Sequence, residues 1–298
     1  MIDFLKDVVR FKWLVITITA LFTLGSAILA INTAEEYKAE VMLMPVNEEQ
    51  ASGLGAMAGQ LGGIASLAGL NVGGGANEKV ALALALIDDW SFADEFIRKH
   101  NLKVYLYAVV GWNKASNELI YDDSVFDNQT MTWKMNDGVS EEPSDWLIFN
   151  ELKERVILRQ QKNSPIITAS LDYYSPELAA KWLDDLLMAI NKKIQANDMQ
   201  DSKNNIDYLS EKVDSTNISE MRTVFYQLLQ EQMKKLMLAE VREEYILKKV
   251  GLVKTPESKF KPRRALIVVM GFFCGFMLSL VLLSFRPIFF ALKEHRVI

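Results

Sequence analysis

The side chains that most often carry catalysis are scarce in this sequence. Histidine occurs twice, as His100 and His295, and the single cysteine is Cys274. The two histidines lie in segments that the hydropathy pattern separates, and Cys274 lies inside a long apolar stretch. A His/Cys metal cluster would need more ligands than these, and no Cys–His nucleophile pair is expected. The sequence predicts no metal site.

Other candidate chemistry is equally thin. The adjacent acids Asp88-Asp89 and Glu141-Glu142 are typical of solvated surfaces, and Gly73–Lys79 lacks both the spacing and the hydroxyl of a phosphate-binding P-loop. Three tryptophans could form a stacking platform for a ligand or could equally be core residues: Trp112, Trp133 and Trp146. We expect no catalytic residue and no cofactor, so the protein is predicted not to be an enzyme.

Two apolar stretches near the ends dominate the hydropathy pattern. Trp13–Ile31 and Ala265–Phe285 contain no charged residue. At ~1.5 Å rise per residue, each is long enough to span a hydrocarbon core of ~30 Å. The first stretch could instead be a signal peptide, but it is long for one and no A-x-A cleavage pattern follows it. We predict transmembrane helices at 13–33 and 265–285.

The charge distribution predicts the orientation of these spans. The tails 1–12 and 286–298 are short and net basic, so both are expected in the cytoplasm. The segment 34–261 is net acidic and is predicted to form a periplasmic domain, although a basic cluster before the second span opposes the rule: Lys254, Lys259, Lys261, Arg263 and Arg264. A sequence pI of 5.3 argues against nucleic acid as a partner.

The central segment mixes strand and helix signals. Glu36–Val46 and Ile166–Tyr173 alternate as half-buried strands do. We expect helices at 78–88, 91–99 (with Ser91 as N-cap) and 146–158, with short elements and loops over 105–144.

Two long helices are predicted at about 176–213 and 218–250. Ser175-Pro176-Glu177 is a strong helix start, and Asp214–Asn217 offers a break between the helices. The second helix carries an apolar stripe, which is expected to form core or to contact a neighbouring subunit along an elongated stalk: Met221, Phe225, Leu229, Met233 and Met237.

A glycine-rich segment, 51–75, holds nine of the chain's 15 glycines among apolar residues. It is too rich in glycine for a stable lone helix and too apolar for an ordinary solvated linker. Two interpretations stay open: a flexible loop, or a segment that becomes ordered only against a neighbouring subunit or the membrane face.

The approach to the second span has its own signals. Pro256 and Pro262 restrict the chain before the span, and Arg263 and Arg264 can lie among lipid head groups. Within the span, Gly271 and Gly275 form a G-x-x-x-G pair that permits close helix packing, and the first span is the expected partner through Gly25, Ser26 and Ala27.

These features together resemble one family. Leu236–Arg264 reads LMLAEVREEYILKKVGLVKTPESKFKPRR and leads directly into a span that contains glycines. After the first span comes a strand with the pattern Y-x-A-x-V-x-L, formed by Tyr37, Ala39, Val41 and Leu43. The segment 84–102 is similar to the helical region that follows this strand in the family. This order resembles the Wzz-type polysaccharide chain-length determinants. The chain departs from them at Val250–Val253, where relatives often have an acidic-Pro-Ala turn.

The resemblance implies a fold and a function. The fold is α+β, with two transmembrane helices flanking an elongated periplasmic domain that has a small mixed sheet near the membrane and a long helical stalk. The function implied is regulation of the chain length of a surface polysaccharide, such as O-antigen, by a homo-oligomer in the bacterial inner membrane. Its partners would be a polysaccharide polymerase, a lipid-linked glycan and membrane lipids. The alternatives are a two-span periplasmic sensor, an export-complex scaffold, or a glycan-binding or glycan-modifying enzyme.

Overall fold

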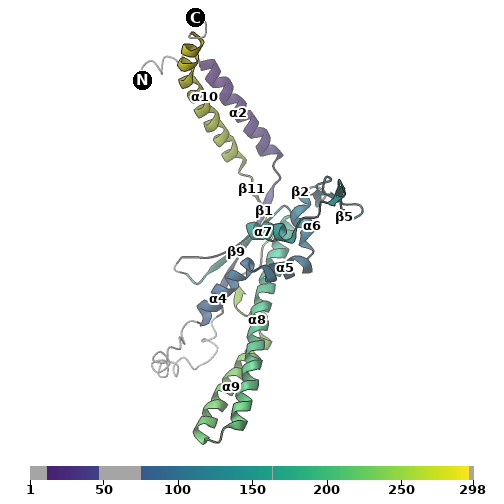
Figure 1. Cartoon of the computed structure of the whole chain (residues 1–298), viewed down its shortest axis with the longest axis vertical. Helices are drawn as coiled ribbons and strands as arrows, with labels where there is room; N and C mark the ends of the chain where they lie inside the picture. Colours follow the sequence, from purple (N-terminus) through teal and green to yellow (C-terminus); the bar gives the residue numbers. More distant parts are fainter. Residues whose placement is uncertain (1–11, 47–74, 163, 295–298) are drawn as a thin grey trace. The chain divides into compact units, whose positions relative to one another are not determined.

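The structure is a computed structural model that describes residues 12–46, 75–162 and 164–294 (Figure 1). The chain divides into two compact units. The first contains residues 1–37, 111–118 and 258–298, and the second contains residues 38–110 and 119–257. The glycine-rich segment discussed above falls outside the described residues, except for Gly75.

The first unit is built on a pair of long apolar helices, α2 (Lys12–Asn32) and α10 (Arg264–Glu294), which lie side by side (Figure 1). Both are long and apolar enough to cross a membrane. The short strand β11 (Lys259–Lys261) pairs antiparallel with the start of β1 (Glu36–Pro45), with Tyr37 opposite Lys259.

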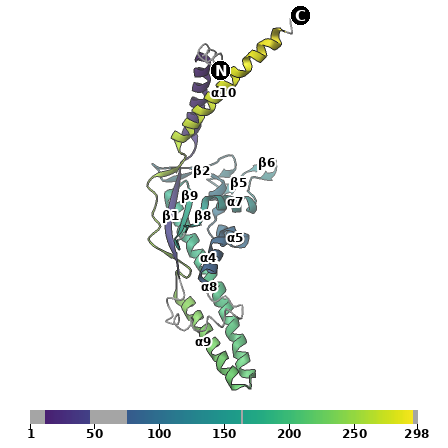
Figure 2. The same cartoon turned by 90° about the vertical axis from the view of Figure 1, so that its left-hand side faces the viewer.

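A sheet with the strand order β10-β1-β9-β8 organises the second unit, and β1, β9 and β8 are visible beside one another in Figure 2. β8 (Val156–Gln160) pairs antiparallel with β9 (Ile167–Tyr173), and β10 (Leu247–Lys249) pairs antiparallel with the end of β1. Burial alternates along β1, and β9 is almost wholly buried. The two strands predicted at 36–46 and 166–173 are confirmed.

Short helices and hairpins accompany this sheet. The helices are α4 (Gly75–Ala85), the 3₁₀ turn η2 (Leu86–Asp88), α5 (Trp90–Lys99), α6 (Leu102–Tyr107) and α7 (Asp145–Arg155). Three two-stranded ribbons occupy much of 109–140: β2 (Val109–Asn113) with β3 (Glu118–Tyr121), β4 (Phe126–Asp127) with β5 (Thr132–Trp133), and β6 (Met135–Asn136) with β7 (Val139–Ser140).

Two local predictions were wrong. The N-cap of α5 is Asp89, whose carboxylate accepts a hydrogen bond from the Phe92 amide at 2.8 Å, and not Ser91. The helix predicted at 146–158 ends at Arg155, because Val156 already has extended backbone and begins the ladder with β9. The helices themselves were therefore predicted, and the errors lie in their first and last residues.

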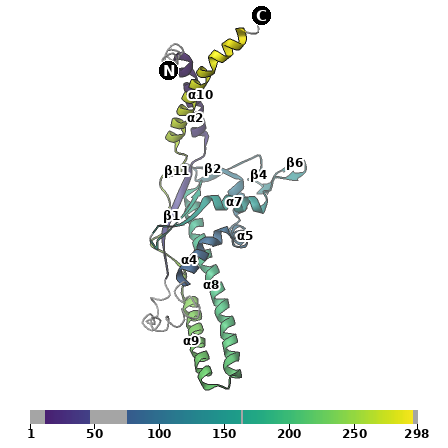
Figure 3. The ribbon, with the colours of Figure 1, turned by 60° about the vertical axis from the view of Figure 1, so that its left-hand side comes forward.

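The two longest helices of the second unit are α8 (Pro176–Ser215) and α9 (Ser219–Val241), which pack together as a hairpin (Figure 3). Ser175 caps α8 through its hydroxyl, as predicted. The second helix was predicted to continue to residue 250, but it ends at Val241. The chain then becomes irregular and forms β10, so Gly251 does not cap a helix.

The core of the second unit lies between the sheet and the first half of α8. Side chains at helical spacing on α8 are almost fully buried: Ala179, Leu183, Leu186, Leu187, Ile190 and Ile194. They belong to the same cluster as Ala39, Val41 and Leu43 of β1 and Ile167, Ala169 and Leu171 of β9. The α+β class is therefore confirmed, with an apolar face of one helix packed on an alternating sheet.

Candidate functional site

The α2–α10 pair is held by two glycines on α10. A Cβ atom built at Gly275 would lie 2.7 Å from Phe22 Cβ and 3.1 Å from Thr19 Cα, and one built at Gly271 would collide with the Ser26 side chain. Residues four apart share one face of a helix, so the two glycines form a single contact surface. Membrane helices pack closely where small residues let their backbones approach.

Gly25 does not take part in this contact. A Cβ atom built there would meet nothing within 4 Å. Its neighbour Ser26 meets Gly271 instead, and Ser26 donates its hydroxyl to the Thr23 carbonyl oxygen at 2.9 Å. The structure therefore brings together Gly271 and Gly275 with Phe22 and Ser26, and leaves Gly25 on an open face.

The turn before the second span, residues 258–264, is tied to the chain that leaves the first span. Glu35 accepts a hydrogen bond from Lys259 Nζ at 2.6 Å and lies 2.9 Å from Arg264 Nη2. Arg264 Nε donates to the Ala30 carbonyl oxygen of α2 at 3.1 Å, and Lys261 pairs with Glu36 at 3.3 Å. We call this set of contacts the ion-pair collar. Its charges join the ends of the two helices outside their apolar stretches.

The remaining predicted residues of this turn have different positions. The peptide bond between Lys261 and Pro262 is cis. The carbonyl oxygen of the exposed Arg263 accepts hydrogen bonds from the amides of Leu266 and Ile267 at the start of α10. Pro256 belongs to the second unit. The two prolines that the sequence groups together therefore fall in different units.

The ion-pair collar predicts a small dependence of stability on pH. The hydrogen bond from Lys259, followed by the charges of Lys259, Arg264 and Lys114, lowers the pKa of Glu35. A carboxyl whose pKa is lower when folded adds stability above its unfolded pKa, and that stability is lost as pH falls through the folded value. Glu35→Gln should lower the free energy of unfolding at neutral pH by no more than ~1 kcal/mol, because the pair is largely exposed, and the thermal midpoint should fall slightly with it.

The measurement is the thermal midpoint of the detergent-solubilised protein as pH is lowered into the acid range. The wild type and Glu35→Gln should converge below the folded pKa of Glu35. Glu118→Gln, an exposed glutamate of the same unit with no ion pair among the described residues, is the control. A constant gap between wild type and Glu35→Gln at every pH would contradict the assignment.

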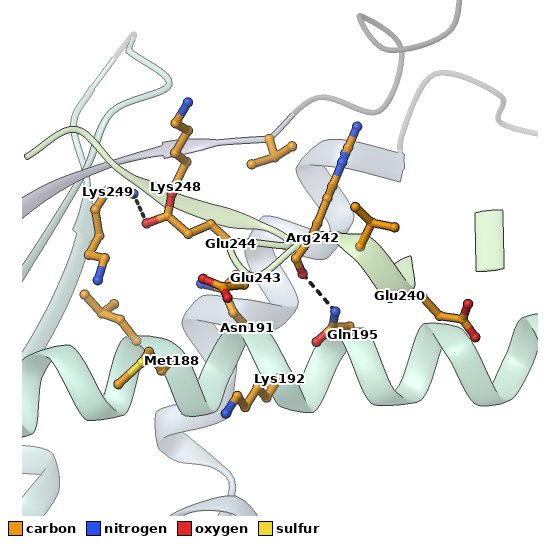
Figure 4. A pocket seen from close by; sticks show the side chains of 13 residues that line it. Met188, Asn191, Lys192, Gln195, Glu240, Arg242, Glu243, Glu244, Lys248 and Lys249 are labelled. Carbon is orange, nitrogen blue, oxygen red and sulfur yellow. Dashed lines mark hydrogen bonds between the residues drawn. The ribbon is translucent and has the colours of Figure 1, made fainter. Parts of the chain in front are cut away.

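A pocket of about 700 Å³ lies in the second unit, between α8 and the chain that follows α9 (Figure 4). Its charged wall residues are nearly balanced: Lys192, Arg242, Lys248 and Lys249 against Glu240, Glu243 and Glu244. Lys249 Nζ lies 2.6 Å from Asp184, and its backbone amide donates to Glu244 Oε1 at 3.2 Å. Lys249 and Glu244 thus help to hold the chain after α9 in place.

Two amides on α8 fix that following chain, and the sequence patterns gave no sign of them. Figure 4 shows Asn191 and Gln195 projecting toward it. Gln195 Nε2 donates to the carbonyl oxygens of Ala239 at 2.5 Å and Arg242 at 2.8 Å, which are among the unpaired carbonyls at the end of α9. Asn191 binds the backbone of Ile246 and Leu247. Single polar residues on an amphipathic helix are too common to be singled out from the sequence.

Among the described residues, the side chains considered for catalysis are not assembled into a site, and His295 lies outside those residues. His100 Nδ1 lies 3.5 Å from Asp185 Oδ2, and Cys274 is exposed on α10. The three tryptophans have separate aromatic partners: Trp112 meets Tyr37, Trp133 meets Phe126, and Trp146 stacks on Trp90. Among residues 12–46, 75–162 and 164–294, no group of three His, Cys, Asp or Glu side chains could hold a metal ion.

The predicted stripe on α9 divides into two sets. Phe225 and Leu229 are half-buried in the hairpin with α8, whereas Met221, Met233 and Met237 are exposed, Met237 to 65%. Val224, Tyr226 and Val241 are also exposed. α9 thus leaves a row of large apolar side chains exposed, which is typical of a surface that meets another molecule.

One family model matches the first part of the chain. Residues 1–75 match the family model "Wzz: Chain length determinant protein". The chain is also similar to a full-length bacterial polysaccharide co-polymerase, at 11% identity over all of both chains with a TM-score of 0.38. It is similar to a fragment of WzzB, a polysaccharide co-polymerase from Salmonella Typhimurium, at 11% identity over 76% of this chain and 100% of that one, with a TM-score of 0.30. No curated protein matches the chain.

The structure defines a class: an α+β protein with two helices long and apolar enough to cross a membrane, one at each end of the described chain. Within that class, residues 1–75, which hold the first helix and the strand after it, resemble the Wzz-type chain-length determinants, as the family match shows.

Proposed function

We propose that this protein regulates the chain length of a surface polysaccharide, as a co-polymerase that has no catalytic site of its own. The observation that carries the proposal is the match of residues 1–75 to the chain-length determinant family. The paired helices α2 and α10 and the α+β domain between them support it, because the family resemblance implies that architecture.

The topology and partners form part of the same proposal. Both basic tails lie in the cytoplasm and the acidic domain 34–261 lies in the periplasm, so α2 and α10 anchor it in the bacterial inner membrane. The partners are a polysaccharide polymerase and its lipid-linked glycan, with O-antigen or a related glycan as product. Length control then depends on how protomers assemble and meet the polymerase, and not on a reacting group.

Homo-oligomerisation through the α8–α9 hairpin, which is the predicted stalk, is the structural basis of this function. The exposed side chains Met221, Met233 and Met237 on α9 support a contact with a neighbouring protomer. Burying one such side chain is worth about 1.5–3 kcal/mol, so a few of them on each protomer can hold a contact between copies. Phe225 and Leu229 support the hairpin that presents this surface.

The test is a gene deletion, complemented with wild type or with variants and followed by gel analysis of the surface glycan. Deletion should change the modal chain length, and wild type should restore it. Met233→Lys/Met237→Lys should fail to restore it and should weaken the oligomer in crosslinking. Asp207→Lys adds the same two units of charge at an exposed position of α8 and should behave as wild type. An unaltered length distribution in the deletion strain would overturn the proposal and leave the sensor or export-scaffold alternative.

A further inference from the structure

The tip of the β2–β3 hairpin, residues 111–118, is grouped with the two long helices although it is far from both in the sequence. The Trp112 ring meets the Tyr37 ring edge-on, with centroids 5.5 Å apart and planes at 86°. Tyr37 itself lies five residues after the end of α2 and opposite Lys259 of β11. The hairpin tip is therefore packed at the base of the helix pair.

The tip is held in shape by its own hydrogen bonds. Trp112 Nε1 donates to Asn117 Oδ1 at 3.0 Å, and Asn117 has a positive φ of 58°. Asn113 Oδ1 accepts from the Ala115 amide at 2.9 Å and from the Ser116 amide at 3.4 Å. These contacts leave the side chains of Lys114 and Ala115 exposed at the end of the turn.

The charges around the tip are unbalanced. In residues 33–37, 111–118 and 258–264, five basic side chains face three acidic ones, a net charge of +2: Lys114, Lys259, Lys261, Arg263 and Arg264 against Glu35, Glu36 and Glu118. The acids Glu35 and Glu36 are engaged in the ion-pair collar. Lys114 and Arg263 make no salt bridge with any described residue, so their charges are available to a partner.

The ion-pair collar shows which part of the two helices the hairpin tip lies beside. Arg264 begins α10 and binds both the Ala30 carbonyl oxygen and Glu35. Trp112 of the hairpin contacts Tyr37, two residues after Glu35, so the end of the hairpin lies close to the ion-pair collar. The head-group region extends a bilayer from ~30 Å of hydrocarbon to ~40–45 Å, which is a layer of several ångströms just beyond the apolar stretch of a spanning helix.

We propose that the hairpin tip 111–118 is a third membrane contact of this protein, which rests on the head-group layer and binds anionic phospholipid phosphates through Lys114 and the basic residues of the pre-span turn 258–264. Tryptophan is favoured at this depth because its ring is apolar while its N–H keeps a polar partner, as Trp112 does with Asn117, and the buried Tyr37 supports the Trp112 ring. Basic side chains near an anionic surface are attracted to its phosphates. The inference depends on α2 and α10 lying in a bilayer and does not depend on the glycan function.

The experiment uses the full chain, with Cys274→Ser to remove the native thiol, reconstituted in phosphatidylethanolamine vesicles with or without phosphatidylglycerol. A fluorophore on Ala115→Cys reports the tip. A fluorophore on Asn217→Cys, in the exposed turn between α8 and α9, is the control. Nitroxide on lipid head groups should quench the label at 115 and not the label at 217, whereas aqueous iodide should quench mainly the label at 217. Equal iodide quenching at both positions, with none from the lipid, would overturn the membrane contact.

A second measurement tests the choice of lipid. Quenching by nitroxide-labelled phosphatidylglycerol, compared with labelled phosphatidylcholine, gives the preference of the tip for anionic lipid. Lys114→Gln should reduce this preference about fivefold, which corresponds to the ~1 kcal/mol that one basic residue contributes near an anionic surface. Lys203→Gln, an equal charge change at an exposed position of α8, should leave it unchanged. The anionic-lipid assignment is wrong if Lys114→Gln matches Lys203→Gln.

Discussion

Gly275→Leu is expected to separate α2 from α10 and to give one of the largest losses of stability of any single substitution in this chain. A Cβ atom at position 275 would lie 2.7 Å from Phe22 Cβ and 3.1 Å from Thr19 Cα, inside normal contact distance. Gly275→Ala alone should cost about 1–3 kcal/mol, the range for overpacking a close-packed contact, and leucine should exceed it. Since lipid tails are as apolar as leucine, shape complementarity holds the pair and little compensates for its loss.

The chain offers a matched control in the same helix pair. A Cβ atom at Gly25 would meet nothing within 4 Å, so Gly25→Leu should leave the pair intact. The free energy of unfolding, measured by titrating the detergent-solubilised protein with SDS and following helicity, should fall in the order Gly25→Leu, Gly275→Ala, Gly275→Leu. Equal losses for the two leucine variants would show that the effect comes from helix propensity or lipid exposure and not from the contact.

This contrast also shows where the sequence is informative about the membrane helices. The spacing of Gly271 and Gly275 places both on one helix face, which is a local property that can be read directly from the residues. Whether Gly25 or Ser26 faces that surface depends on the rotation of one helix about its axis relative to the other. That angle is determined by the packing of the whole pair, so the sequence could name Gly25, Ser26 and Ala27 as a group but could not say which of them meets Gly271.

The same distinction applies to the second unit. The strands at 36–46 and 166–173 and the Ser175 cap depend on local alternation and local hydrogen bonding, and the sequence predicts them. The end of α9 is held by Gln195 and the chain after it by Asn191, through hydrogen bonds to residues 44 to 56 positions away in the sequence. The apolar period continues through Met237 and Val241, so no local signal distinguishes the end of the helix from its middle.

The candidate sites divide in the same way. The basic residues before α10 were identified because charges next to an apolar span are conspicuous in the sequence. Their partners Glu35 and Glu36 were not identified, since acidic residues are common and the pairing joins positions that are more than 200 residues apart. The hairpin tip at Trp112–Asn117 could not be placed beside them for the same reason.

Asn191→Leu is expected to release the chain after α9 from α8. Asn191 is 4% exposed and makes three hydrogen bonds of 2.9 Å, from its Nδ2 to the Leu247 carbonyl oxygen and to its Oδ1 from the amides of Ile246 and Leu247. Leucine has a similar shape but leaves those backbone groups buried without a partner. Each unsatisfied buried group costs about 1–3 kcal/mol, so the expected loss is about 3–5 kcal/mol in the free energy of unfolding.

The loss should extend into the sheet, because the residues that Asn191 holds also lead into β10. Leu247 lies opposite Pro45 of β1, and the Val46 amide donates to the Ile246 carbonyl oxygen at 2.8 Å. Hydrogen exchange at the amides of Ile246 and Leu247 should therefore accelerate in Asn191→Leu, together with a lower denaturation midpoint. Asn205→Leu, the same change at an exposed position of α8, should stay within ~0.5 kcal/mol of wild type. Equal losses of stability in the two variants would show that the hydrogen bonds of Asn191 have no special role. A loss confined to Asn191→Leu would identify Asn191 as the residue that fixes where the helix stops and the strand begins.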